Sequence, residues 1–197
     1  MKIRMDKGRK LYSLPEAYRL FYKAMRTIRY MSKSRKNNEV SLKFMERIML
    51  AVTQVNTCAV CSYAHTKMAL EAGMSNKEIQ NLLAGTIDDA PADEVTAVLF
   101  AQHYADTRGK PSKDSWERMV TVYGPSKAKG ILGAIRIIML ANTYGIAGGS
   151  FLNRFKGMPD QRSNLMYEIS ILVTIPVFIP AVLIHVLLAA LFRIPLI

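Results

Sequence analysis

The stretch NTCAVCSYAH, residues 56–65, contains both cysteines of the 197-residue chain. Two cysteines separated by two residues and followed four positions later by a histidine suit a redox pair or half of a metal site. At about 100° per residue, Cys58, Cys61 and His65 fall near one face of a helix. This stretch therefore predicts a helix that brings two thiols and an imidazole together.

The position of the cysteines at the start of this helix has a chemical consequence. We expect Asn56 or Thr57 to cap the helix, which would place both cysteines in its first turn. The unpaired N–H groups and the positive dipole end of a helix stabilise a thiolate there. Glu46, twelve residues before Cys58, can fold back from the preceding helix to hold a proton or to orient the histidine.

Composition limits the class of protein. The length allows one domain with a core and one appendage, and 50% of the residues are apolar. The first residues lack the apolar segment of a cleavable signal peptide, so we expect a reducing compartment, where a Cys-x-x-Cys pair indicates redox or metal chemistry.

The charge distribution is strongly basic. The net charge is +12, and residues 1–43 hold thirteen Lys or Arg against three acidic residues. No zinc-finger, helix-turn-helix or RNA-binding motif accompanies this charge, so we do not expect nucleic acid as a partner. A solvated basic face and contact with an anionic membrane surface both remain open.

The spacing of apolar residues is helical throughout, and it predicts an all-α fold of about six to eight helices. Arg136 interrupts the most apolar of the internal helices, which favours a buried central helix over a membrane span. The expected helices cover residues 16–31, 40–55, 57–73, 75–84, 91–104, 112–123 and 126–147.

The C-terminal segment 169–192 contains no Asp, Glu, Lys or Arg and is long enough to cross a hydrocarbon layer of about 30 Å. Pro176 and Pro180 are tolerable in a membrane helix. We expect a single-pass anchor here, preceded by a linker at 158–168 and a helical domain at 1–157. An apolar helix buried in an oligomer, or a hairpin that does not cross, is the alternative.

The basic residues that flank this segment predict its orientation. Arg154, Lys156 and Arg162 precede it, whereas only Arg193 follows it. Positive charges favour the cytoplasmic side, so the domain is expected to be cytoplasmic and attached to the membrane.

The pattern Glu-x11-Cys-x2-Cys-x3-His resembles the carboxymuconolactone decarboxylase superfamily, in its alkylhydroperoxidase D-like branch. The segments EAGMS at 71–75 and FAQHYAD at 100–106, and the later Asn142, are also similar to that family. The resemblance extends over about residues 15–157. It implies an all-helical domain that forms homo-oligomers.

The resemblance also implies roles for individual residues. Cys61 matches the peroxidatic cysteine that attacks a hydroperoxide, and Cys58 matches the resolving cysteine that closes a disulfide. His65 and Glu46 match the proton relay. The substrate would be a hydroperoxide or a protein disulfide, the reductant would be a dithiol such as a lipoyl group on a partner protein, and no cofactor is expected.

One position departs from the family pattern, because Val60 stands where the best-characterised branch has a histidine between its cysteines. This removes a proton donor near Cys58 and leaves thiol–disulfide exchange intact.

Other chemistry also stays open at this point. Glu46 and the Cys–Cys–His group are plausible zinc ligands, although no second ligand pair is visible. Cofactor-free decarboxylation or lactone chemistry needs no cysteine pair, and a non-catalytic membrane scaffold is a third alternative.

Overall fold

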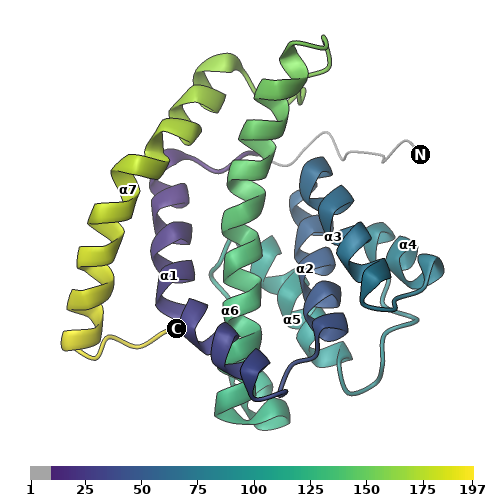
Figure 1. Cartoon of the computed structure of the whole chain (residues 1–197). Coiled ribbons are helices and arrows are strands. Elements are labelled where there is room, and N and C mark those ends of the chain that lie inside the picture. Colours follow the sequence, from purple (N-terminus) through teal and green to yellow (C-terminus); the bar gives the residue numbers. More distant parts are fainter. Residues whose placement is uncertain (1–9) are drawn as a thin grey trace.

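The computed structural model describes residues 10–197, and within that range the chain forms seven α-helices and no strand, which confirms the all-α prediction. Residues 1–9 lie outside the described residues. They include the N-terminal part of the basic segment and the first residues, which were expected to lack a signal peptide. The helices are α1 (Leu14–Lys36), α2 (Leu42–Asn56), α3 (Ala59–Glu71), α4 (Asn76–Ala84), α5 (Val95–Asp106), α6 (Lys113–Arg154) and α7 (Leu165–Leu191) (Figure 1).

Helix α6 is the central element, with α1 and α7 on one side and α2 and α5 on the other (Figure 1). Glycines let α1 approach it closely: a Cβ on Gly133 would lie 2.8 Å from the backbone oxygen of Thr27. Most of the apolar residues in the middle of α6 are buried, which confirms the predicted central helix; they are Ile131, Leu132, Ile135, Ile138 and Met139, whereas Ile137 and Leu140 are partly buried. Its arginine, Arg136, is buried too, and donates from Nε to the Tyr104 hydroxyl at 2.8 Å.

The sequence predicts separate helices at 112–123 and 126–147, and the structure has a kink between them within α6. Gly124 has φ 72° and ψ 161°, and Pro125 follows it, so two helical segments meet at an angle within α6. Glycine adopts positive φ without steric cost, and proline favours the first turn of the segment that follows. The second segment extends past the expected end at residue 147 to Arg154.

Several other helix ends differ from the prediction. Helix α1 continues past residue 31 to Lys36, because the polar residues of its last two turns are mostly solvated and its terminal cations complement the helix dipole. Helix α5 begins at Val95, after a turn at 92–94, rather than at Pro91. Ser75 caps α4 by accepting from the Glu78 N–H, and the Glu78 carboxylate accepts from Arg47.

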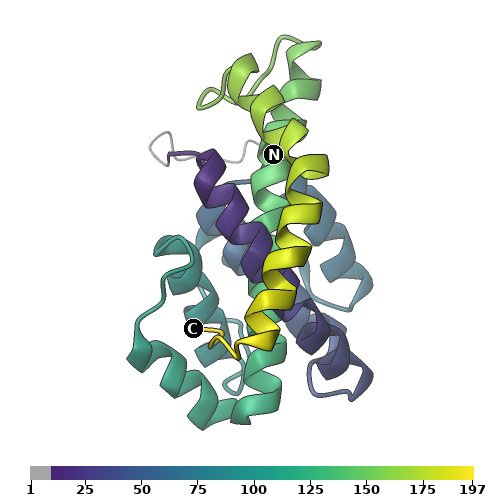
Figure 2. The ribbon, with the colours of Figure 1, turned by 90° about the vertical axis from the view of Figure 1, so that its left-hand side faces the viewer.

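Helix α7 forms an outer layer that lies along α1 and α6 (Figures 1 and 2). It begins at Leu165, inside the expected linker. Both α6 and α7 are long and apolar enough to cross a membrane, but 72% of the most apolar window of α6 is buried in the protein, against 17% for α7. Helix α7 is therefore the element that presents an apolar surface.

Candidate functional site

The turn between α2 and α3 sets the position of the cysteines. Helix α2 extends to Asn56, and Thr57 closes it with a left-handed backbone at φ 56° and ψ 47°. Cys58 is therefore the N-cap of α3, and the expected cap at Asn56 or Thr57 is wrong. The reason is local: a residue that ends one helix in the left-handed region does not have the extended backbone of an N-cap. Cys61 lies in the first turn, and Cys58 precedes it.

Cys58 and Cys61 form a disulfide with their Cα atoms 5.3 Å apart. The sulfur of Cys58 also takes the place of a capping oxygen, because it accepts a hydrogen bond from the Cys61 N–H at 3.3 Å. The two cysteines differ in access: Cys58 is fully buried and Cys61 is 7% exposed. Only the Cys61 side of the disulfide reaches the surface.

The backbone of α6 forms the wall behind the two sulfurs. A Cβ on Gly145 would lie 2.7 Å from the Cys61 sulfur and 3.0 Å from the Cys58 sulfur. One turn later, a Cβ on Gly149 would lie 2.6 Å from a methyl group of Val60. Glycine at these positions lets the central helix touch the disulfide turn directly.

Glu46 and His65 are paired beside the disulfide turn. The Nδ1 atom of His65 lies 2.7 Å from Oε2 of Glu46, and their side chains are 14% and 2% exposed. A carboxylate that accepts from Nδ1–H fixes the ring and leaves Nε2 as the proton acceptor. His65 is one helical turn after Cys61, so the pair supplies an oriented base on the same helix as the more exposed sulfur.

A buried ion cluster holds α2 in place next to this pair. Arg47 is 1% exposed and donates to the carboxylates of Glu78 and Glu94. Burial raises the pKa of Glu94 in spite of the arginine beside it. The cluster ties the residue that follows Glu46 to α4 and to the start of α5, and so fixes the position of the Glu46–His65 pair.

Arg162, from the segment between α6 and α7, clamps the turn before the first cysteine. Its guanidinium donates to the Thr57 backbone oxygen at 3.1 Å and to the Thr57 hydroxyl. Asp160 pairs with it at 2.6 Å. Burial alone would raise the pKa of Asp160, but hydrogen bonds from Arg162 outweigh it and hold the pKa below its ordinary value. A threonine in the left-handed region is strained, so this clamp stabilises a costly conformation.

A buried amide lies next to the sulfurs on α6. Asn142 is fully buried, three residues before Gly145, and its Oδ1 accepts from the Thr53 hydroxyl at 3.2 Å. Its Nδ2 is a buried donor without a partner among the described residues. This buried hydrogen bond joins α2 to α6 about one turn before Gly145.

The structure thus places all four residues selected from the sequence in one region. Sequence reasoning missed Arg162, since nothing local links it to a cysteine 104 positions away. It also missed Gly145, although three glycines in one apolar helical stretch are a usable sign of close packing. Across residues 10–197, no group of three or more His, Cys, Asp or Glu side chains is arranged to hold a metal ion.

Comparison with known families gives one result. The model of the carboxymuconolactone decarboxylase family matches residues 15–103, a range that contains Glu46, both cysteines and His65. This confirms the superfamily expected from the sequence, without specifying the branch; residues 104–157, where the resemblance was expected to continue, lie outside the match. No curated protein and no solved structure matches the chain.

Proposed function

We propose that this chain, whose residues 15–103 match the carboxymuconolactone decarboxylase family, is a thiol-dependent oxidoreductase that reduces a hydroperoxide or a disulfide. The observation that carries the proposal is the Cys58–Cys61 disulfide at the start of a helix, beside a buried Glu46–His65 pair. A disulfide alone is compatible with a structural role, whereas the adjacent oriented base is what proton transfer requires.

The oxidative half-reaction starts from the dithiol. His65, oriented by Glu46, accepts the proton of the Cys61 thiol, and the thiolate attacks the distal oxygen of a hydroperoxide. The O–O bond breaks, Cys61 becomes a sulfenic acid, and the alkoxide leaves as an alcohol with the proton returned by His65. Cys61 is the nucleophile because it is the more exposed cysteine and because the histidine lies one turn after it.

Cys58 completes the oxidative half-reaction. Its thiolate attacks the Cys61 sulfur, hydroxide leaves as water, and the disulfide forms. In the reductive half-reaction, one thiolate of a dithiol reductant attacks the exposed Cys61 sulfur, forms a mixed disulfide and displaces Cys58 as a thiolate. The Cys61 N–H that donates to the Cys58 sulfur stabilises this leaving group. The second thiol of the reductant then releases Cys61.

Val60 bears on the substrate. It occupies the position of a histidine in the best-characterised branch, and here it is half-exposed and packs against α6 at Gly149. The strongly exposed Tyr63 lies one turn further along α3. These exposed apolar groups on the helix that carries Cys61 favour an organic hydroperoxide or a thiol carrier with an apolar arm over hydrogen peroxide.

We further propose attachment to a membrane through α7 and assembly into homo-oligomers, with the domain on the cytoplasmic side. The support for attachment is the apolar surface of α7. The support for oligomers is the resemblance to the family.

A single-turnover thiol count tests the redox proposal. The reduced protein, freed of reductant, is mixed with an organic hydroperoxide, and free thiols and intact mass are followed for wild type, Cys58→Ser and Cys61→Ser. We expect wild type to lose two thiols, Cys58→Ser to stop at a sulfenic acid, and Cys61→Ser to be inert. His65→Asn should react slowly, whereas His103→Asn, on α5, should react like wild type.

One outcome of this experiment would contradict the redox proposal, and another would reverse the roles of the two cysteines. If neither wild type nor any variant loses thiols to a hydroperoxide or to a lipoyl disulfide, the redox proposal is wrong. Decarboxylase chemistry of the same family, which needs no cysteine pair, would then be the next hypothesis. If Cys61→Ser reacts and Cys58→Ser does not, the roles of the two cysteines are reversed.

A further inference from the structure

Helix α7 has one face buried against the domain and one face exposed. The inner face carries the buried residues Glu168, Ile171, Val182 and Ala189. The outer face is a stripe of exposed apolar side chains that lie within about 20° of Met166 on either side, at about 100° per residue. Its members are Met166, Val173, Val177, Ile184 and Leu191, with exposed fractions from 56% to 75%.

The inner face is attached to the domain along its whole length. At the start of α7, Glu168 pairs with Arg154 at 2.6 Å. In the middle, the Thr174 hydroxyl lies 2.8 Å from that of Tyr144. Near the end, His185 lies 2.6 Å from the Tyr18 hydroxyl.

The residues after α7 continue this attachment. The backbone oxygens of Ile194 and Pro195 accept from Arg26, and that of Leu196 accepts from Arg136 at 2.6 Å. The chain end is thereby fixed against α1 and α6, and it lies beside α1 in Figure 1. These polar contacts would all be lost if α7 left the domain to cross a bilayer by itself.

A span with the domain still attached meets a different obstacle. Helix α1 lies beside α7 and carries seven Lys or Arg residues between Arg19 and Lys36. An upright α7 would carry this basic helix to the depth of the hydrocarbon, where charged side chains are expensive. The docked arrangement therefore does not fit a perpendicular helix.

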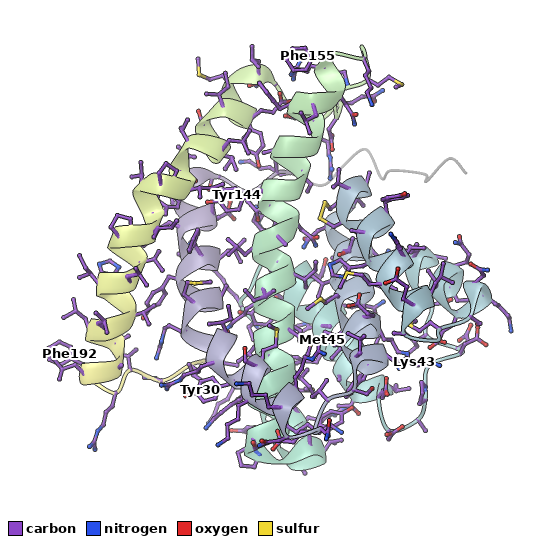
Figure 3. All side chains as sticks on the ribbon, in the orientation of Figure 1. Tyr30, Lys43, Met45, Tyr144, Phe155 and Phe192 are labelled. Atoms are coloured by element: carbon purple, nitrogen blue, oxygen red, sulfur yellow. A yellow bond between two sulfur atoms is a disulfide. The ribbon has the colours of Figure 1, made fainter. Side chains whose placement is uncertain are left out.

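We propose that α7 lies in the plane of the membrane, with its outer stripe immersed in one leaflet that contains anionic lipid. The domain takes the place of the polar face that an interfacial helix normally has. The side chains of α7, and that of Phe192, which caps its end, project from the outer edge of the molecule (Figure 3). The cations of α1, with Arg29, Lys33 and Arg35 exposed, supply charge complementary to acidic headgroups.

The segment between α6 and α7 connects the proposed membrane helix to the redox site. The segment that joins α6 to α7 includes Asp160 and Arg162, which hold the turn before Cys58. Ser150 and Glu168 connect the same segment to the start of α7. A helix that lies flat on the leaflet keeps these contacts and so leaves the turn before the disulfide intact.

Depth measurements by tryptophan quenching test the orientation. In a Trp116→Phe background, single tryptophans are placed at Met166, Val177 and Leu191 in the full-length chain. The probe is a vesicle of phosphatidylglycerol and phosphatidylcholine with bromine either near the headgroup or deep in the acyl chain. The wild-type protein, with Trp116 alone, is the control for a site away from α7.

An in-plane helix gives the same result at all three positions: strong quenching by shallow bromine and weak quenching by deep bromine. A spanning helix of about 1.5 Å per residue places Val177 near the bilayer centre and the other two near opposite surfaces, and that pattern overturns the proposal. Absence of quenching, with dimers in sedimentation, would show that a second copy covers the stripe and would also overturn it. None of these outcomes depends on the redox activity.

Discussion

The contact between α6 and the disulfide predicts a measurable effect of adding one methyl group. In Gly145→Ala the new Cβ would lie 2.7 Å from the Cys61 sulfur, whereas ordinary contacts begin at 3.4 Å. The sulfur or the helix must therefore move by at least 3.4 − 2.7 = 0.7 Å. The Cys58 sulfur, at 3.0 Å, prevents the Cys61 side chain from yielding by itself.

The expected cost follows from two opposing contributions. Replacing glycine by alanine inside a helix stabilises the folded protein by about 0.5–1 kcal/mol. Forcing a methyl group into a packed interface costs about 1–3 kcal/mol. The net effect of Gly145→Ala is thus a loss of about 0–2.5 kcal/mol, and the comparison with a matched control separates the two contributions.

Gly148→Ala is that control. It adds the same methyl group to the same helix, but its nearest neighbour is a methyl group of Leu172 at 3.8 Å, an ordinary contact. We expect Gly148→Ala to gain about 0.5–1 kcal/mol, so the two variants should differ by about 1–3 kcal/mol.

The assay is urea unfolding of the oxidised proteins, followed by the single-turnover reaction of the reduced proteins with an organic hydroperoxide. Gly145→Ala should be the less stable variant and should lose thiols more slowly than Gly148→Ala. Equal unfolding free energies and equal rates in the two variants would refute the conclusion that the α6 backbone forms the wall of the sulfur site.

Three further predictions concern charged groups. Glu46→Gln keeps a hydrogen-bonding side chain but removes the charge that supports the histidine, so stopped-flow measurement of thiol oxidation should show a rate lower by about 10²–10⁴-fold; an unchanged rate would remove Glu46 from the relay. Arg108 donates to Glu16 and lowers its pKa from 4.5 to about 2, so this pair stabilises the fold above pH 4.5 and loses its effect as the pH falls towards 2. Glu16→Gln, which can keep the helix cap, should cost about 1–2 kcal/mol in urea unfolding at pH 7, and its difference from wild type should shrink towards pH 2; a gap independent of pH would contradict this. Arg162→Gln should cost about 2–3 kcal/mol because it leaves Asp160 unpaired, and the double variant with Asp160→Asn should recover part of the loss; no recovery would mean that the clamp on the turn, rather than the ion pair, carries the effect.

The sequence by itself determined the helical class and the grouping of Cys58, Cys61 and His65. Both follow from short-range periodicity, since residues three and four apart share a helix face whatever surrounds them. The pairing of Glu46 with His65 needed one more step, a turn between consecutive helices. The composition of residues 169–192 likewise predicted an apolar C-terminal helix, because a lack of charge over that length is a local property.

The tertiary structure decided what surrounds these groups. The cap moved to Cys58 because α2 continues to Asn56, and the extent of a helix depends on its packing as well as on its caps. Arg162 reaches the turn only after the chain has passed through α3, α4, α5 and α6, so no local pattern encodes that contact. Helix α7 shows the same division: its length and hydropathy suit a membrane span, but its contacts with α1 and α6 bury one face in the protein and leave the other face exposed.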